Sequence, residues 1–332
     1  MSVISVRGLR KVFEVQRKPE STWGRLVSTF RPETVKVEAV KGIDLEVQKG
    51  ETLAFIGPNG AGKSTTIKML TGILHPTAGE AEVLGFTPWM QRQRLAFRIG
   101  SVFGQKSQLW LHLPPVDTFN LLARIYELDW GAYLKRRHEL VELFELEEIM
   151  QTPARKLSLG QRMRCEIAAC LLHRPEIIFL DEPTIGLDPV AKGAIRDLIR
   201  RSNREEGVTV FLTSHDAGDI ESLAKRVVII NHGQMILDDS LGALRRDFMQ
   251  EREIDLKLGL PFDGHLDLPG VKVVKAKGYG VKLSVDTAVI PIEAVVGRLL
   301  QTYTVQDIAI TMPPMEQIIA DIYREQRGEV HR

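Results

Sequence analysis

One segment of this chain specifies its fold more than any other, and it reads Gly57-Pro58-Asn59-Gly60-Ala61-Gly62-Lys63-Ser64-Thr65. It fits the pattern G-x-x-x-x-G-K-[S/T], with an apolar strand-like run at Thr52–Ile56 before it and a helix-like run at 64–74 after it. Glycines here let several backbone amides and a helix N-terminus face one polyphosphate. We expect Lys63 to bind the β- and γ-phosphates of a nucleotide and Ser64 to offer its hydroxyl to Mg²⁺. The alternative is a glycine-rich turn with an exposed lysine. Such a turn would not need every residue of the motif, nor a strand before it and a helix after it.

A second motif is a short apolar strand that ends in two carboxylates. Residues 177–183 read IIFLDEP, so that Asp181 and Glu182 follow the apolar run directly. Open parallel sheets bind ligands at the carboxyl ends of their strands. We expect Asp181 to hold Mg²⁺ through water, and Glu182 to orient and deprotonate the attacking water. A capping acidic pair is the alternative, but together with the phosphate motif this arrangement indicates a nucleoside triphosphatase.

Four further motifs distinguish among the classes of triphosphatase. Residues 157–162 read LSLGQR just before a helix, where Ser158 alone would be a helix cap. In this order the hexapeptide resembles the LSGGQ signature of ATP-binding-cassette (ABC) ATPases, with Leu159 where the family usually has glycine. Gln105 resembles the family's Q-loop glutamine, residues 186–188 (GLD) resemble its D-loop, and residues 213–216 (TSHD) resemble its switch-histidine loop. Phe13 best matches the aromatic residue that stacks on adenine.

The resemblance implies that each ATP, with Mg²⁺, lies between two copies of the chain. The phosphate loop of one copy holds the nucleotide, and the signature of the other covers it. Switch residue His215 would contact the γ-phosphate, and Gln105 would sense Mg²⁺ and the water. The implied site residues are, for the nucleotide, Phe13, Gly57, Pro58, Asn59, Gly60, Ala61, Gly62, Lys63, Ser64, Thr65, Ser158, Gly160, Gln161 and Asp188; for catalysis, Glu182, His215 and Gln105; and for Mg²⁺, Ser64, Gln105 and Asp181.

One chain carries one cassette, so a two-fold dimer with two composite sites is expected. Because Glu182, His215 and most of the signature are intact, we favour a homodimer. A heterodimer with a second ATPase is the alternative.

The length of 332 residues suggests about two domains, since one domain typically takes roughly 150 residues. We predict an α/β P-loop ABC ATPase core with a largely parallel sheet in residues 1–239, and a linker helix and small α+β accessory domain in 240–332. Within the core, the strand signal fades over about 86–175, which predicts an inserted helical subdomain, and residues 14–38 form an unusual insertion. The predicted core strands are Thr52–Ile56, 177–180, 208–212 and 227–230. The predicted second-domain elements are strands 253–258, 271–275, 281–285 and 305–310, and helices 292–300 and 315–324.

Charge and composition argue against several classes of protein, although a local basic patch that binds DNA stays possible. The 44 basic and 43 acidic side chains leave a formal charge of +1, which gives no chain-wide field that would attract nucleic acid. No apolar run approaches the roughly 18 to 20 residues that cross a bilayer, and no secretion signal is evident. Cys165 and Cys170 form no metal-ligand or disulfide framework, as expected in a reducing cytoplasm. Any membrane role must therefore come through a partner.

The region after Gln105 favours a transporter. Residues 102–119 read VFGQKSQLWLHLPPVDTF, and Trp110, Leu111 and Leu113 have the character of exposed apolar residues. In transporters of the family this region forms the groove that receives a coupling helix of the membrane subunit. The alternative is that these residues pack inside the helical subdomain.

Over the whole chain, the closest resemblance is to the detached ATPase subunits of bacterial type-2 ABC exporters. It rests on VFGQKSQLW, LSLGQRMRCE, TSHD and PPMEQIIADIY. It implies an ATPase at the cytoplasmic face of the membrane, peripheral, partnered with integral membrane permease subunits, and no nucleic acid is expected. The alternatives are an importer ATPase, or a soluble ABC ATPase acting on nucleic acid or ribosomes. Against the second, no sustained heptads separate Lys63 from Ser158, and the chain has neither zinc modules nor a second cassette.

The insertion at 14–38 contains a further apolar pattern. Trp23, Leu26, Val27 and Phe30 recur at helical spacing with basic residues around them. Such a helix lies on an anionic membrane, docks on a partner, or packs on its own domain. For the accessory domain the possible roles are contact within the dimer, regulation or stabilisation. The sequence does not identify the transported substrate.

Overall fold

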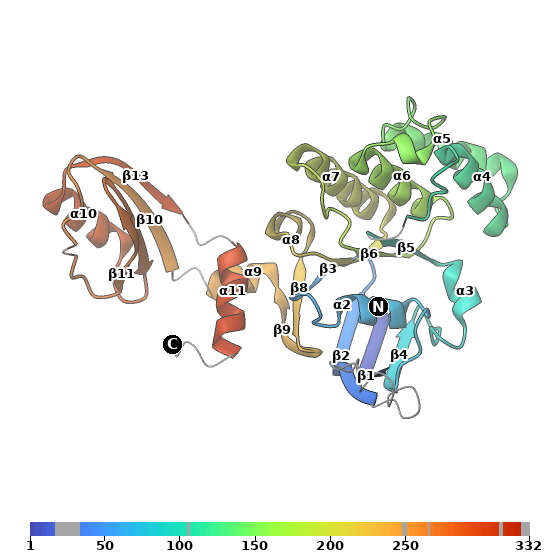
Figure 1. Cartoon of the computed structure of the whole chain (residues 1–332), viewed down its shortest axis with the longest axis horizontal. Helices are drawn as coiled ribbons and strands as arrows, with labels where there is room; N and C mark the ends of the chain where they lie inside the picture. Colours follow the sequence, from blue (N-terminus) through green and yellow to red (C-terminus); the bar gives the residue numbers. More distant parts are fainter. Residues whose placement is uncertain (17–33, 105–106, 248–250, 265, 312–314, 327–332) are drawn as a thin grey trace, which may run out of the picture. The chain divides into compact units, whose positions relative to one another are not determined.

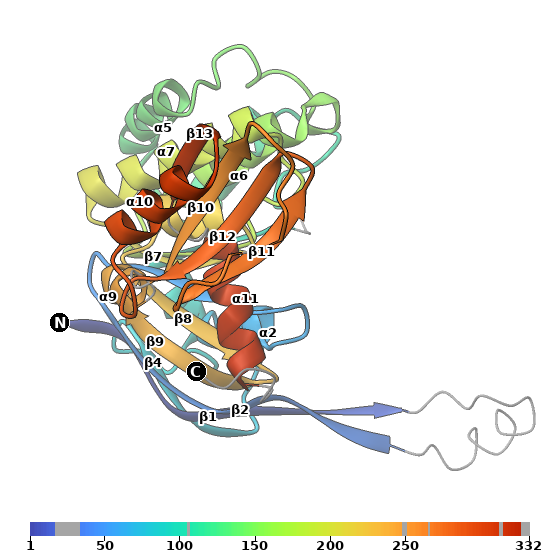
Figure 2. The ribbon, with the colours of Figure 1, turned by 90° about the vertical axis from the view of Figure 1, so that its left-hand side faces the viewer.

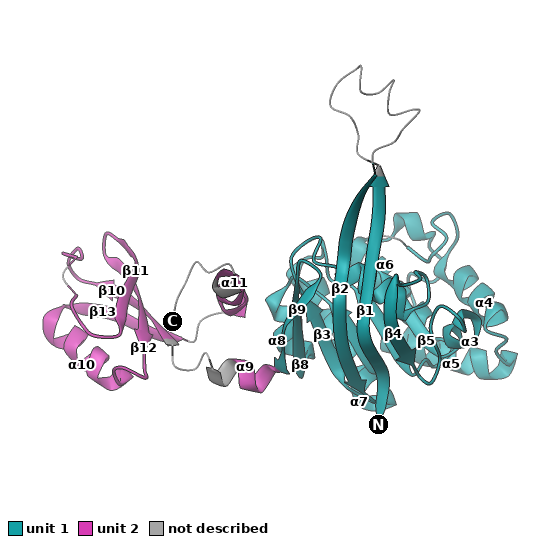
Figure 3. Ribbon diagram, turned by 90° about the horizontal axis from the view of Figure 1, so that it is seen from below, with its two compact units in different colours: residues 1–239 teal, residues 240–332 magenta. Residues whose placement is uncertain are grey.

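The computed structural model describes residues 1–16, 34–104, 107–247, 251–264, 266–311 and 315–326. The chain divides into two compact units, residues 1–239 and 240–332 (Figure 3). Among the described residues, no helix combines the length and the apolar character needed to cross a membrane.

The centre of the first unit is a six-stranded sheet in the order β5-β6-β7-β3-β8-β9. Neighbouring strands from β5 to β8 run parallel. The hairpin from β8 to β9 turns at His232 and Gly233, which both have positive φ, as a two-residue type I′ turn requires. The strands are β3 (Thr52–Ile56), β5 (Ile99–Phe103), β6 (Ile177–Asp181), β7 (Thr209–Thr213), β8 (Arg226–Asn231) and β9 (Gln234–Ser240).

The predicted α/β class and the four predicted core strands are confirmed, with strand ends that differ from the prediction by at most one residue. The prediction that strand character fades throughout 86–175 was wrong, because β5 lies in that range and pairs with β6. The helical insertion therefore begins after Phe103. Gly100 and Ser101 interrupt the apolar run of β5, so the sequence pattern did not indicate a strand there. Gly100 is needed because a Cβ there would lie 2.3 Å from Cys170 Sγ, so the strand packs closely on a helix.

The two faces of the central sheet pack against different layers (Figure 1). Phe55, Phe179 and Phe211 belong to one apolar core, while Leu180 and Leu212, from alternate positions of the strands, belong to another. This alternation is the pattern of strands buried on both faces. Helices of this unit are α2 (Lys63–Leu70), α3 (Arg92–Ala96), α4 (Pro115–Ile125), α5 (Trp130–Leu143), α6 (Leu159–Leu171), α7 (Pro189–Glu206) and α8 (Ala217–Leu223), with the 3₁₀ helix η1 (Ala154–Lys156).

A second sheet of the first unit was not predicted from the sequence. It is antiparallel, in the order β2-β1-β4, and consists of β1 (Ser2–Gln16), β2 (Thr34–Gln48) and β4 (Ala78–Val83). Strands β1 and β2 continue as a two-stranded ribbon past the end of β4 (Figure 2). The described ends of the 14–38 insertion extend these two strands. Its apolar stripe at Trp23, Leu26, Val27 and Phe30 lies outside the described residues.

The second unit has the predicted α+β character. Its antiparallel sheet has the order β11-β12-β10-β13, and α10 contributes Val295 and Leu299 to a core shared with Ile254 and Leu283. The elements are α9 (Leu241–Asp247), β10 (Glu251–Leu258), β11 (Val271–Lys277), β12 (Gly280–Asp286), α10 (Ile292–Thr302), β13 (Val305–Thr311) and α11 (Met315–Gln326).

Candidate active site

The phosphate loop connects β3 to α2 and depends on two glycines. A Cβ at Gly57 would lie 2.3 Å from the Ile230 carbonyl oxygen, and one at Gly62 would lie 2.5 Å from the Ala39 carbonyl oxygen. Gly62 also has a φ of 106°, which favours glycine. No larger residue fits either position, so the loop keeps the tight course that turns its amides toward one anion.

The predicted phosphate and carboxylate residues surround one cavity of about 480 Å³. The cavity lies where the carboxyl ends of β3, β6 and β7 meet the start of α2, as expected for a parallel sheet. Its lining consists of Ala39, Asn59, Gly60, Ala61, Gly62, Lys63, Ser64, Thr65, Asp181, Glu182, Ile185 and His215.

Four charged or titratable groups line this cavity, namely Lys63, Asp181, Glu182 and His215. The buried Lys63 Nζ donates to the Gly57 carbonyl at 2.6 Å and lies 2.9 Å from His215 Nε2 and 3.8 Å from Glu182 Oε1. Burial lowers the pKa of Lys63, opposed by the neighbouring carboxylates Glu182 and Asp181. The ammonium is thus presented where phosphate oxygens would compete with the loop carbonyl.

His215 bridges the cation and the carboxylate. Its Nε2 lies 2.8 Å from Glu182 Oε1, as well as 2.9 Å from Lys63 Nζ. Burial and the Lys63 charge lower the pKa of His215, which favours the neutral imidazole. One nitrogen donates to Glu182 or accepts from Lys63, but not both at once, so the tautomer decides which contact is a hydrogen bond.

The backbone of Glu182 has an unusual conformation. Its φ is 56°, in the left-handed region that non-glycine residues seldom occupy. The Glu182 amide donates to both the carbonyl (3.1 Å) and the hydroxyl (3.1 Å) of Thr213. Gly104 lies against it so closely that a Cβ would sit 2.7 Å from the Glu182 carbonyl oxygen. Residues held in such conformations concentrate at functional sites.

The residues predicted for Mg²⁺ offer a suitable set of oxygens. Ser64 Oγ donates to Asp181 Oδ1 at 3.2 Å, and Thr213 Oγ1 donates to the same oxygen at 2.6 Å. Mg²⁺ prefers one or two carboxylates or hydroxyls together with waters and phosphate oxygens, so Ser64 and Asp181 fit it. Gln105, also predicted for Mg²⁺ and catalysis, lies outside the described residues. Thr213 was missed as a site residue, although its place in TSHD, two residues before the switch histidine, was a signal.

The signature residues lie apart from this cavity within one chain. Ser158 caps α6: its Oγ accepts from the Gln161 amide at 3.2 Å, and Gln161 Oε1 accepts from the Ser158 amide at 2.9 Å. Gly160 lets the start of α6 approach α7, since a Cβ there would lie 3.0 Å from Ala191 Cβ. Asp188 Oδ1 caps α7 by accepting from the Val190 and Ala191 amides. None of Ser158, Gly160, Gln161 and Asp188 lines the phosphate cavity.

Phe13 is not among the residues that line the phosphate cavity. It pairs with Val37 across β1 and β2, and Val37 is two residues from Ala39, which lines the cavity. Two residues of strand span about 7 Å, which is within the reach of a nucleotide base from its phosphates. Lys11 Nζ lies 5.2 Å from the Phe13 ring centroid.

A buried carboxylate that the sequence did not reveal connects the two loops of the site. Asp219 is fully buried and accepts from Thr184 Oγ1 (2.5 Å), Ser214 Oγ (2.6 Å) and Arg196 Nε (2.7 Å). Thr184 follows Glu182 and Ser214 precedes His215, so Asp219 fixes both loops against α7. Its position four residues after the histidine was the only signal.

Replacing Asp219 by alanine is expected to lower the free energy of unfolding by about 3 kcal/mol, because it leaves Nε of Arg196 and two buried hydroxyls without their acceptor, while Arg196 keeps its pair with Asp216. Chemical denaturation measures the loss. Asp197→Ala, which removes an exposed ion pair with Arg200 on α7, is the control and should cost less than about 0.5 kcal/mol. Equal stabilities of the two variants would contradict the role given to Asp219.

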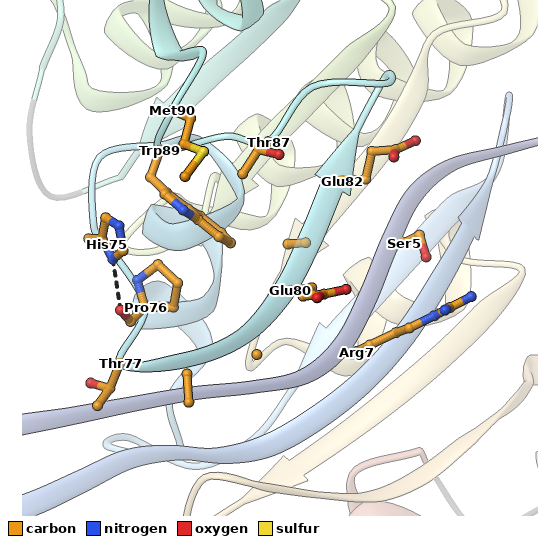
Figure 4. Close-up of a pocket in the computed structure, with 13 residues that line it drawn as sticks. Ser5, Arg7, His75, Pro76, Thr77, Glu80, Glu82, Thr87, Trp89 and Met90 are labelled. Carbon is orange, nitrogen blue, oxygen red and sulfur yellow. Dashed lines mark hydrogen bonds between the residues drawn. The ribbon is translucent and has the colours of Figure 1, made fainter.

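A larger cavity of the first unit lies away from these motifs. Its volume is about 720 Å³, and it is lined by residues of β1, β4 and the loops before and after β4 (Figure 4). Arg7 and Glu80 lie at its wall, and His75 and Trp89 lie with ring centroids 5.5 Å apart. It contains no residue of the phosphate, carboxylate or signature motifs. The smaller cavity, with its cation, carboxylates and histidine, is therefore the candidate active site.

A family model, two related sequences and a solved structure all match this chain. Residues 40–185 match the family model described as ABC transporter. The daunorubicin/doxorubicin resistance ATP-binding protein DrrA of Streptomyces peucetius is 36% identical over 207 residues, which cover 62% of each chain. The daunorubicin resistance ATP-binding protein DrrA3 of Streptomyces coeruleorubidus is 31% identical over 300 residues, covering 87% of this chain and 92% of that one. The dimeric ATP-binding cassette MJ0796, in a post-hydrolysis state with ADP and Pi, superposes with a TM-score of 0.60 at 25% identity, covering 72% of this chain and 98% of that one.

Proposed function

This chain belongs to the ABC transporter ATP-binding family, and from that premise we propose that it is the ATP-hydrolysing subunit of a membrane exporter. The observation that carries the proposal is the convergence of Lys63, Glu182 and His215, within 4 Å of one another, on a phosphate loop. The matches to resistance ATP-binding proteins support export over import, and the match to DrrA3 is long enough to reach into the second unit.

The reaction assigned to the site is hydrolysis of ATP. Lys63 would neutralise charge on the β- and γ-phosphates, and His215 would contact the γ-phosphate. Glu182 would accept a proton from the attacking water, which its position beside His215 allows. Mg²⁺ bound at Ser64 and Asp181 would neutralise charge on the phosphate oxygens.

We propose that the working form is a homodimer. In one chain Ser158, Gly160 and Gln161 do not line the phosphate cavity, so a second copy is needed to cover the nucleotide. The exposed apolar side chains of Ile185 and Val190 flank the D-loop and are suited to burial in such an interface. The dimeric state of MJ0796 supports this arrangement. A second, different ATPase in the complex is the alternative.

Dimer closure would transmit the energy of hydrolysis. ATP would attract the N-termini of both α6 helices, which carry partial positive charge, and so draw two copies together. Hydrolysis and phosphate release remove that attraction, and the dimer opens.

The partner surface is proposed at residues 107–113, here called the Trp110 segment. Leu109 is buried, but Trp110, Leu111 and Leu113 are 51%, 42% and 37% exposed. The structure thus does not place these three residues inside the helical subdomain. An exposed apolar cluster of this kind is typical of an interface, and we propose that a cytoplasmic segment of a permease binds it at the membrane.

Replacing Trp110 and Leu111 with serine is expected to abolish most association with the permease, because it removes the apolar side chains from the centre of the proposed contact. Affinity purification from detergent-solubilised membranes of cells that produce the protein measures the association, as the amount of multispanning protein recovered with it. ATP binding by the isolated variant should stay within about twofold of the parent. Met90→Ser, at a site that is 77% exposed, is the control. Undiminished recovery of the permease by the double variant would refute this surface.

The same complex tests the function as a whole. ATP hydrolysis in proteoliposomes should rise when the permease is present, whereas action on nucleic acid predicts stimulation by DNA, RNA or ribosomes instead. Failure of the protein to associate with any membrane protein would exclude the exporter assignment.

A further inference from the structure

Glu166 is a buried carboxylate that the proposed reaction does not use. It lies on α6, eight residues after Ser158, and is only 4% exposed. Its two oxygens accept hydrogen bonds from the hydroxyl of Ser107, at short range, and from the amide of Gln108 at 2.9 Å. Burial raises the pKa of Glu166, and these hydrogen bonds oppose the rise. A buried acceptor with such partners is costly to disturb, so it fixes the start of the Trp110 segment to the signature helix.

The other end of the Trp110 segment is bonded to the chain just before the signature. The Arg155 amide donates to the Leu111 carbonyl at 2.8 Å, and the Ala154 amide donates to the Leu113 carbonyl at 3.0 Å. Ser158 follows Arg155 by three residues. Hydrogen bonds from the Trp110 segment therefore reach the chain on both sides of the signature, through η1 before it and through Glu166 after it.

A small cavity lies between the Trp110 segment and α6. It has a volume of about 200 Å³, and its wall includes Leu111 of the Trp110 segment together with Leu159, Met163 and Glu166 of α6. Packing of Leu111 against α6 is therefore incomplete at this cavity, and the hydrogen bonds of Glu166 add a polar link between the segment and α6 beside it. Leu159, which replaces the family's usual glycine, stands at the same wall.

We propose that Glu166 is a positioning residue that couples the Trp110 segment to the signature helix, so that engagement of Ser158 by nucleotide and occupation of the Trp110 surface by a partner affect each other. This inference rests on the proposed function, since it requires a second copy to bring ATP to Ser158. The coupling is reciprocal. A movement of α6 during dimer closure moves the Trp110 segment, and a partner bound to the Trp110 segment changes the equilibrium between the open and the closed dimer.

Hydrogen exchange in three variants tests this coupling. The background is Glu182→Gln, which holds ATP with little turnover, and it is compared with the same protein carrying Glu166→Ala or Glu166→Gln. In the background, ATP with Mg²⁺ is expected to slow exchange of the amides in residues 107–113 about tenfold, a usual size for coupling between sites. With Glu166→Ala the ATP-dependent change should be lost although the dimer still forms, and Glu166→Gln, whose amide oxygen still accepts, should restore most of it.

The possible results distinguish failure of the coupling through Glu166 from failure of the proposed function. An equal ATP effect with and without Glu166, in proteins that both dimerise, overturns the inference and leaves the ATPase assignment intact. Absence of any ATP-dependent dimer in the Glu182→Gln background, seen by size-exclusion chromatography, overturns the dimer proposal and the inference with it. If Glu166→Ala does not fold by circular dichroism, Ser107→Ala removes one of the same bonds at an exposed position and should still reduce the ATP effect.

Discussion

ATP turnover is expected to fall by about 10²- to 10⁴-fold when Glu182 is replaced by glutamine, while affinity for ATP stays near that of the parent protein. Glutamine keeps the size of the side chain and a hydrogen-bonding oxygen toward His215, which now lies 2.8 Å from Glu182 Oε1. It has no basic carboxylate to take the proton of the attacking water. The contacts that hold the phosphates come from Lys63 and the loop amides, and these are unchanged.

The same variant should accumulate as a closed dimer. Because nucleotide binding draws the two copies together and hydrolysis separates them, blocking hydrolysis leaves the closed state populated. Phosphate release measures turnover, and size-exclusion chromatography with ATP and Mg²⁺ measures the dimer. Glu176→Gln is a matched control, because Glu176 stands at the opposite end of β6 and pairs with Arg98. Normal turnover in Glu182→Gln would remove Glu182 as the base.

The sequence predicted those parts of the site whose functional residues lie next to one another along the chain. The phosphate loop, the strand that ends in Asp181 and Glu182, and the loop with His215 each occupy a few consecutive residues. The parallel sheet then brings their carboxyl ends together, as the strand pattern implied. Contacts formed between distant elements gave no such signal. Asp219 and Glu166 are acidic residues on helices, and only the folded chain shows them buried against other loops.

The missed strands have a similar explanation. Pairing of β1 with β2 shifts register four times, so apolar residues do not alternate regularly along either strand. Gly100, required by the close approach of Cys170, interrupts the apolar run of β5. For Ser158 the prediction from sequence was incomplete for another reason. Its capping hydrogen bonds follow from the sequence, but in the proposed function it reaches the nucleotide only in an assembly of two chains.

Replacing Lys63 by alanine is expected to weaken ATP binding about 30- to 3,000-fold, which distinguishes it from the Glu182 variant. Removing one partner of a buried charge contact costs about 2 to 5 kcal/mol, and each 1.4 kcal/mol is a factor of ten in affinity. Lys63 is buried, and its ammonium lies among the Gly57 carbonyl, His215 and Glu182. Without it, the negative charges of Glu182 and Asp181 repel the triphosphate more strongly.

Equilibrium binding of a fluorescent ATP analogue measures this loss, and Lys68→Ala, an exposed lysine on the same helix, is the control. Arginine at position 63 should not restore binding, because a planar guanidinium does not fit a pocket whose carbonyl lies 2.6 Å from the ammonium. In the double variant Lys63→Ala and Glu182→Gln, the closed dimer should disappear at ATP concentrations that saturate Glu182→Gln. If the closed dimer persisted there, the phosphates would not be what joins the two copies, and the signature's attraction to ATP would have to be abandoned as the cause of closure.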